Sequence, residues 1–104
     1  MITEARIKSL ILEALKTVKE SEPAYRNLAL NDQTPILGKT SALDSIAFTA
    51  FATDLEEKVE DETGNPYVLR VEEITRAHGK QTPIRVADLA RAIAGQIQKP
   101  VRKR

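Results

Sequence analysis

The sequence predicts an all-α fold, a four-helix bundle with three long helices and a short third one. Three amphipathic stretches carry this prediction, and segments rich in Pro, Gly and Asn separate them. In each stretch apolar residues recur at intervals of three and four, which is the spacing of one face of a helix. We assign residues 1–98 to one small domain. Residues 99–104 form a basic C-terminal tail that we expect to be flexible.

The first helix is expected over residues 3–19, with Thr3 as its N-cap. Its apolar stripe consists of Ile7, Leu10, Ile11, Ala14, Leu15 and Val18. From Glu20 to Leu43 the periodicity fails among Pro, Asn and Gly residues, so we expect a long loop. Apolar side chains should hold this loop, and any short helical turn in it, against the bundle: Leu28, Leu30, Ile36 and Leu37.

The second helix is expected over residues 44–61, and Gly64 should stop it. Its stripe consists of Phe48, Phe51, Ala52, Leu55 and Val59. A short third helix over residues 71–77 would turn Ile74 inward and end at Gly79. The last helix should begin at Thr82–Pro83 and end at Pro100. Its stripe consists of Val86, Leu89, Ala90, Ile93 and Ile97.

Composition excludes several kinds of site. The chain has no Cys and only one His, His78, so disulfides, thiolate metal sites and His-rich metal sites are excluded, and a reducing cytoplasm suits it. No apolar run approaches the roughly 20 residues of a membrane span, and the N-terminal pattern is not that of a signal peptide. The two Phe, two Tyr and no Trp argue against a base-stacking surface for nucleic acid.

Charge is distributed unevenly along the chain, although the net charge is only +1. Seven of the 15 acidic residues lie between Asp44 and Glu62, where Lys58 is the only base. Four basic residues lie in the tail. A solvated terminus is the simplest interpretation of that tail. Binding of nucleic acid or of an acidic partner through the tail is the alternative, and the acidic second helix argues against nucleic acid.

The residues that could carry chemistry converge on Ser45. No glycine-rich phosphate loop is present, nothing marks His78 for catalysis, and neighbours such as Glu56 and Glu57 do not face each other on a helix. We therefore expect no catalytic or resident metal site. Ser45 begins the second helix, where Asp44 can act as the cap. Free N–H groups and the positive end of the helix dipole stabilise a phosphate at such a place.

Ile46 should point away from the core beside Ser45, with the small residue Thr49 near it. Exposed apolar surface that is rimmed by charge is common at partner sites, although single exposed apolar residues are also ordinary.

At these residues the sequence resembles the acyl carrier protein family. The family signature is a loop of Gly and small residues, then Leu-Asp-Ser-Leu/Ile, then an acidic helix with Leu-Glu-Glu. The corresponding residues here are Gly38, Ser41, Leu43, Asp44, Ser45, Ile46, Leu55, Glu56 and Glu57. The resemblance extends from Ile36 to Ile97. The chain departs from the family in its basic tail, in Ala47 and in a longer segment between Gly64 and Pro83, which suggests a specialised carrier.

The resemblance implies a non-catalytic monomeric carrier. A phosphopantetheinyl transferase would attach 4'-phosphopantetheine from coenzyme A to Ser45, with Asp44 helping to hold Mg²⁺ only during that step. The arm would carry acyl groups as thioesters, loaded by an acyl- or aminoacyl ligase, to ketosynthase or acyltransferase enzymes of fatty-acid, polyketide or lipid synthesis. Neither nucleic acid nor membrane would be a partner. The implied partner contacts are Ile46, Thr49, Glu56, Glu57 and Glu60.

Two alternatives remain open on the sequence. The same arm also serves aminoacyl and peptidyl carriers, and the sequence does not separate these from acyl carriers. An unmodified interaction module of the same fold would instead bind partners through the second helix.

Overall fold

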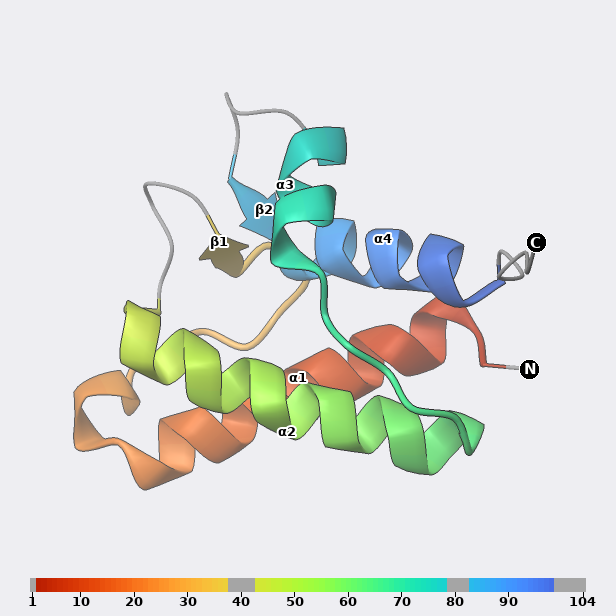
Figure 1. Cartoon of the computed structure of the whole chain (residues 1–104). Helices are drawn as coiled ribbons and strands as arrows, with labels where there is room; N and C mark the ends of the chain where they lie inside the picture. Colours follow the sequence, from red (N-terminus) through yellow and green to blue (C-terminus); the bar gives the residue numbers. More distant parts are fainter. Residues whose placement is uncertain (1, 38–42, 79–82, 99–104) are drawn as a thin grey trace.

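The computed structural model describes residues 2–37, 43–78 and 83–98, and it is mostly helical. Its elements, in chain order, are α1 (Glu4–Ser21), the 3₁₀ turn η1 (Pro23–Tyr25), β1 (Pro35–Leu37), α2 (Ser45–Thr63), α3 (Val71–His78), β2 (Ile84–Arg85) and α4 (Val86–Gln98). Figure 1 shows α1 packed between α2 and α4. The expected tail, the loop residues Gly38 and Ser41, and the expected ends at Gly79 and Pro100 lie outside the described residues.

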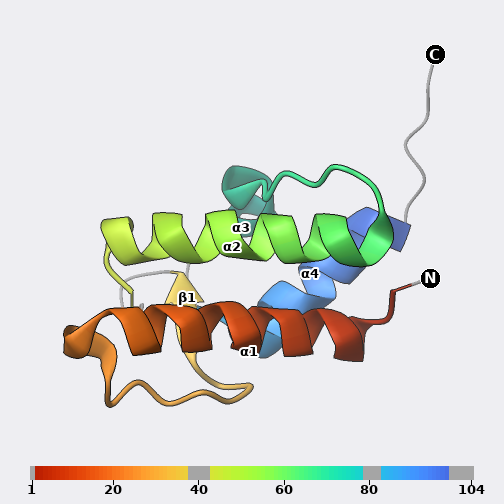
Figure 2. The same cartoon turned by 90° about the horizontal axis from the view of Figure 1, so that it is seen from below.

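Helix α1 forms where its cap and stripe predict. Thr3 is the N-cap, and its hydroxyl oxygen accepts a hydrogen bond of 3.1 Å from the backbone N–H of Arg6. The whole predicted stripe is buried. Helix α2 runs antiparallel to α1, so the end of α1 and the start of α2 lie at the same end of the molecule (Figure 2).

Helix α2 is bounded by the two residues that the sequence marks for that purpose. Asp44 is its N-cap, and Gly64 ends it in the left-handed conformation, with φ of 76°. Glycine adopts this conformation without the steric cost that a Cβ would bring. The buried face consists of Ala47, Phe51, Leu55 and Val59. Phe48 and Ala52, which we expected in the core, are only half-buried.

The connection after α1 is packed on the helices, as expected, and it contains the short turn η1. Ile36 is buried, and Leu28, Leu30 and Leu37 pack against the core. The buried Thr34 organises the turn before β1. Its hydroxyl donates a 2.6 Å hydrogen bond to the carbonyl of Ala29.

The purely α-helical prediction is wrong in one place. Residues Ile84–Arg85 form strand β2, which pairs antiparallel with β1, and α4 begins at Val86 instead of at residues 82–83. The loop fixes this start, because the carbonyls of Thr34 and Asp32 accept hydrogen bonds from the N–H groups of Val86 and Ala87. Asp88 also reaches back to accept from the N–H of Arg85 at 3.1 Å. These contacts satisfy donors that a helix start otherwise leaves free.

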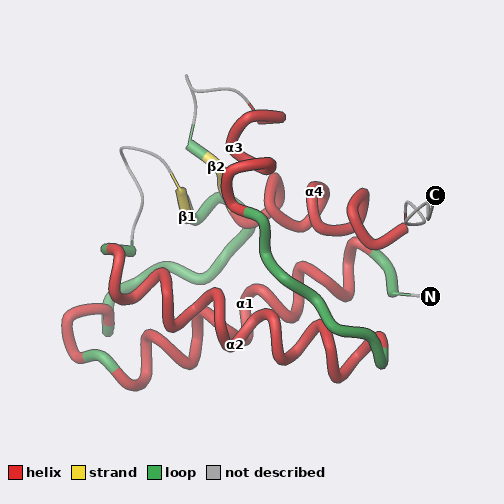
Figure 3. Tube along the Cα trace, in the orientation of Figure 1, coloured by secondary structure: helices red, strands yellow, loops and turns green. Residues whose placement is uncertain are grey.

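Helix α3 has the predicted position and turns Ile74 into the core. The linker between α2 and α3 does not extend away from the bundle. It folds back along α2, as Figure 3 shows, and Leu69 is buried.

Candidate functional site

The site begins with the cap of α2, which is held from two sides. The Asp44 carboxylate accepts a 2.8 Å hydrogen bond through Oδ1 from the N–H of Ala47, and the Asp44 carbonyl accepts one from Phe48. The N–H of Asp44 itself donates to the hydroxyl of Tyr25 at 3.2 Å. Tyr25 packs against the core. The loop after α1 therefore helps to position the first turn of α2.

Ser45 is the first residue of α2, and it is exposed. Its hydroxyl makes no hydrogen bond to any residue that the structure describes, and within the same residues the N–H groups of Ser45 and Ile46 have no acceptor. These two donors lie at the positive end of the helix dipole. The surroundings of the Ser45 hydroxyl therefore favour a negatively charged group.

Ile46 lies beside this hydroxyl and points into solvent, as its place in the helical period predicts. Its side chain is 81% exposed. Thr49 is exposed one turn further along, and its hydroxyl donates a 2.8 Å hydrogen bond to the carbonyl of Ser45. At about 100° per residue, positions 46, 49, 53, 57 and 60 fall within an arc of about 80°. They form one outward strip, which we call the α2 strip.

The three glutamates that we expected to act together on this helix differ in their surroundings. Glu57 and Glu60 are exposed on the α2 strip. Glu56 is half-buried, and its Oε2 accepts a 2.8 Å hydrogen bond from the backbone N–H of Leu69. Glu56 is therefore not a freely solvated acid like Glu57 and Glu60. Its carboxylate holds the returning linker.

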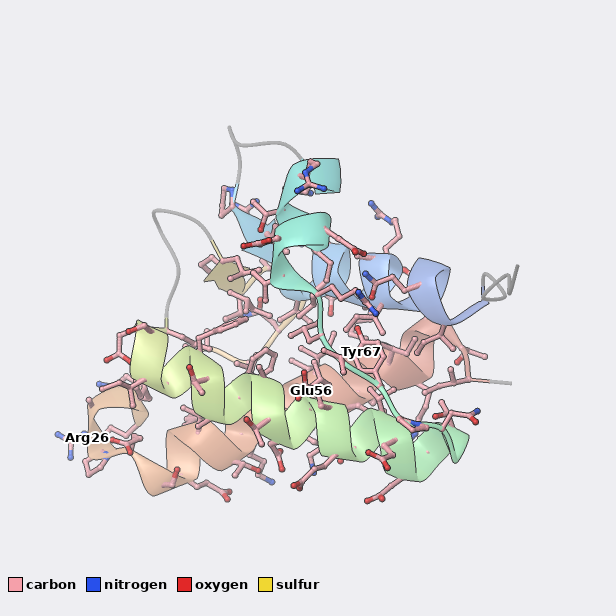
Figure 4. The ribbon with its side chains drawn as sticks, viewed as in Figure 1. Arg26, Glu56 and Tyr67 are labelled. Carbon is pink, nitrogen blue, oxygen red and sulfur yellow. The ribbon has the colours of Figure 1, made fainter. Side chains whose placement is uncertain are left out.

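Tyr67 completes this attachment of the linker and has no counterpart in the sequence analysis. Its hydroxyl donates a 3.0 Å hydrogen bond to Oε1 of Gln96, so it joins the linker to α4. Burial, with the charge of Glu56 adding to it, raises the pKa of Tyr67 well above its ordinary value. Figure 4 labels Glu56 on α2 and Tyr67 on the returning linker, both near the middle of the molecule.

A cavity of about 590 Å³ lies at the far end of α2, between the linker and α4. Val59, Tyr67, Val68 and Ile97 give it a largely apolar lining. Because a helix rises about 1.5 Å per residue, Val59 lies about 21 Å along α2 from Ser45. The cavity is thus separate from the first turn of α2.

None of the helices in the described ranges is long and apolar enough to span a lipid bilayer. A scan against protein-family models, a search of curated proteins and a search of solved structures each find no match for the chain.

Proposed function

We propose that the chain is an acyl carrier protein that bears 4'-phosphopantetheine on Ser45. The observation that carries the proposal is the first turn of α2. There an exposed serine hydroxyl, which makes no hydrogen bond to a described residue, stands between a capping aspartate and the exposed Ile46. This arrangement agrees with the Leu-Asp-Ser-Ile resemblance of the sequence. The long loop before α2 and the short α3 also suit a carrier-type bundle, whereas the β1–β2 pair is an addition to it.

The residues present fit a phosphodiester on Ser45. The N–H groups of Ser45 and Ile46, which have no acceptor among the described residues, and the helix dipole stabilise negative charge at this position. Asp44 uses Oδ1 for the cap, while its Oδ2 makes no hydrogen bond to a described residue. That oxygen is free to serve as a ligand of Mg²⁺ during attachment, since Mg²⁺ prefers carboxylate oxygens.

Attachment is a single group transfer that a separate enzyme catalyses. The Ser45 Oγ forms a bond to the phosphorus of the pantetheine phosphate in coenzyme A and gives up its proton. The bond from that phosphorus to the leaving adenosine 3',5'-bisphosphate breaks. Once attached, the arm supplies a thiol that carries the cargo as a thioester. The chain itself keeps the arm exposed and raises its effective concentration at a docked enzyme.

The α2 strip is the surface through which we propose that partner enzymes dock. Ile46 supplies an apolar contact, Thr49 is small, and Glu57 and Glu60 add negative charge. A partner with a basic patch beside its active-site entrance suits this strip, because complementary charge speeds encounter and selects partners. We leave Glu56 out of this surface because the linker already occupies its carboxylate.

The test is the intact mass of the purified chain after incubation with coenzyme A, Mg²⁺ and a broad-specificity phosphopantetheinyl transferase. We expect one added phosphopantetheine on the native chain and on Ser9→Ala, which removes another exposed serine hydroxyl. We expect none on Ser45→Ala. An unchanged mass with several transferases would contradict the proposal and favour an unmodified interaction module. Loading of the modified chain by acyl or by aminoacyl ligases would then distinguish the two kinds of cargo.

A further inference from the structure

A second place in the molecule has the chemistry of a binding site, on the other side of α1 from α2. The loop that follows α1 runs along this side, as Figure 2 shows. Between α1 and this loop lies a depression of about 400 Å³, which is lined by Lys16, Lys19, Glu20, Arg26 and Leu30. Three cationic side chains from two segments of the chain thus border one hollow, with a single acid among them.

These three cations differ from Arg6 and Lys8 because no carboxylate of a described residue pairs with them. Arg6 pairs with Glu62 at 3.0 Å and Lys8 with Asp32 at 2.9 Å. Across the described residues, Lys16, Lys19 and Arg26 form no ion pair and no side-chain hydrogen bond. Glu20, although it lines the same depression, does not pair with any of them.

The backbone that carries the cations is held in place. The N–H of Arg26 donates to the carbonyl of Pro23 at 3.2 Å, and Leu28 donates to Tyr25 at 2.9 Å. Leu30, the apolar residue of the depression, also packs against the core. Figure 4 shows Arg26 on this loop, at the end of the molecule where α1 ends. Binding an anion here would not require the loop to be ordered first.

The balance of charge indicates what the depression would bind. Three positive side chains face one carboxylate and the C-terminal end of α1, which carries about half a negative charge. The remaining excess is about 1.5 positive charges, more than stabilisation of the helix end requires. Lysine and arginine together are suited to phosphate oxygens. The small volume suits a compact group and not an extended polymer.

We propose that the depression binds a small soluble ligand that carries two or more phosphate groups. This site does not depend on Ser45 or on the carrier function. The depression lies on the side of α1 that faces away from α2, whereas the α2 strip lies on α2 itself. The two surfaces therefore remain accessible at the same time.

The experiment is an NMR titration of the ¹⁵N-labelled full chain with inorganic pyrophosphate at low ionic strength. We expect saturable shifts of the amide signals of residues 16–30, with a dissociation constant of about 1 mM or less. Salt should weaken the binding because it screens exposed charges. The double variant Lys16→Gln/Arg26→Gln should bind at least about tenfold more weakly, since each lost charge removes attraction to a multivalent anion.

Three comparisons make the test specific. Arg91→Gln removes an exposed cation that forms no ion pair elsewhere in the described structure, and it should leave the affinity unchanged. Glu20→Gln removes the single acid and should strengthen binding severalfold. Ser45→Ala should bind as the native chain does, so failure here and failure of the carrier proposal are separate results.

Any of three results would overturn the proposal. The first is the absence of saturable shifts, and the second is an equal loss of affinity in Arg91→Gln. The third is binding to phosphatidylcholine vesicles that contain phosphatidic acid, without binding to pyrophosphate. A urea unfolding curve for each variant checks that these exposed substitutions leave the fold intact.

Discussion

The two halves of α2 use their polar side chains in different ways. In residues 44–53, the side chains of Asp44 and Thr49 form hydrogen bonds within the first turns of the helix, and the side chains of Ser45 and Ile46 are exposed to solvent. In residues 54–63, two of the acidic side chains bind other parts of the chain. Glu56 accepts from the linker, and Glu62 pairs with Arg6, which lowers the pKa of Glu62. The first half exposes its polar side chains to solvent, whereas the second half also holds other segments of the chain.

This difference shows that the acidity of a helix does not by itself define a docking surface. Glu56 and Glu57 are neighbours in the sequence, but the first holds the linker and the second faces water. Substitutions of the acids that bind other segments, such as Glu56, should therefore affect stability. Substitution of Ser45 should affect modification, and substitutions on the α2 strip should affect partner binding.

The largest expected effect compares Leu55→Ala with Ile46→Ala. Leu55 is completely buried, so its truncation should lower the free energy of unfolding by about 2–5 kcal/mol. Ile46 is 81% exposed, so its truncation should change that free energy by less than about 0.5 kcal/mol. Urea unfolding measures both. Similar losses in the two variants would contradict the assignment of the faces of α2.

A smaller effect is expected for Glu56→Ala against Glu57→Ala. Removing the Glu56 carboxylate leaves the N–H of Leu69 without its acceptor and should cost about 1–2 kcal/mol. Glu57→Ala removes the same group from an exposed position and should be close to neutral. Hydrogen exchange of residues 64–70 should rise only in the Glu56 variant. Equal exchange in both variants would mean that the linker is held without Glu56.

The Asp44 cap can be separated from any role of Asp44 in modification. Asp44→Ala should cost about 1 kcal/mol, because the N–H of Ala47 loses its partner. Asp44→Asn keeps a good capping residue, so its stability should stay near native. Under the carrier proposal its modification should nevertheless slow markedly, because the charged oxygen for Mg²⁺ is lost. The rate is followed by intact mass, and a native rate in Asp44→Asn would remove that role.

The smallest expected effect is the contribution of Tyr67 to the pH dependence of the free energy of unfolding. Below about pH 10 the phenol holds its proton in both the folded and the unfolded chain, so its contribution is fully present. Because the pKa of Tyr67 is raised in the fold, the unfolded chain loses this proton first. The free energy of unfolding therefore falls as the pH rises above about 10. The fall should be shallower in Tyr67→Phe. Parallel pH profiles of unfolding would show that Tyr67 does not contribute.

Local signals in the sequence predict much of the fold. Thr3, Asp44 and Gly64 bound α1 and α2 because caps act through hydrogen bonds and conformations of nearby residues. The start of α4 was missed because Pro83 resembles a helix start locally. Its actual position depends on carbonyls of residues 32 and 34, about 50 residues earlier in the chain. The β1–β2 pair depends on the same long-range approach.

The candidate site also contains residues that local signals predict and residues that depend on contacts distant in sequence. The helical period predicts that Ile46 faces outward, and Ser45 follows directly from its place at the cap. Glu56 lies at the border between the exposed and buried faces of α2, so the helical period does not determine its surroundings. They are determined by the returning linker, whose Leu69 is 13 residues away in the sequence. Tyr25 gave no signal because it lies in an irregular loop, and the Asp44 N–H that it accepts from is distant in sequence.

The measurement that bears most directly on the central claim is peptide mapping of the chain after co-production with a phosphopantetheinyl transferase. Fragment masses locate the added group on one residue. We expect phosphopantetheine on Ser45 and on no other serine, because Ser45 alone follows the capping Asp44 at the start of α2. An adduct on another residue, or an unmodified Ser45 peptide in fully folded protein, would contradict it.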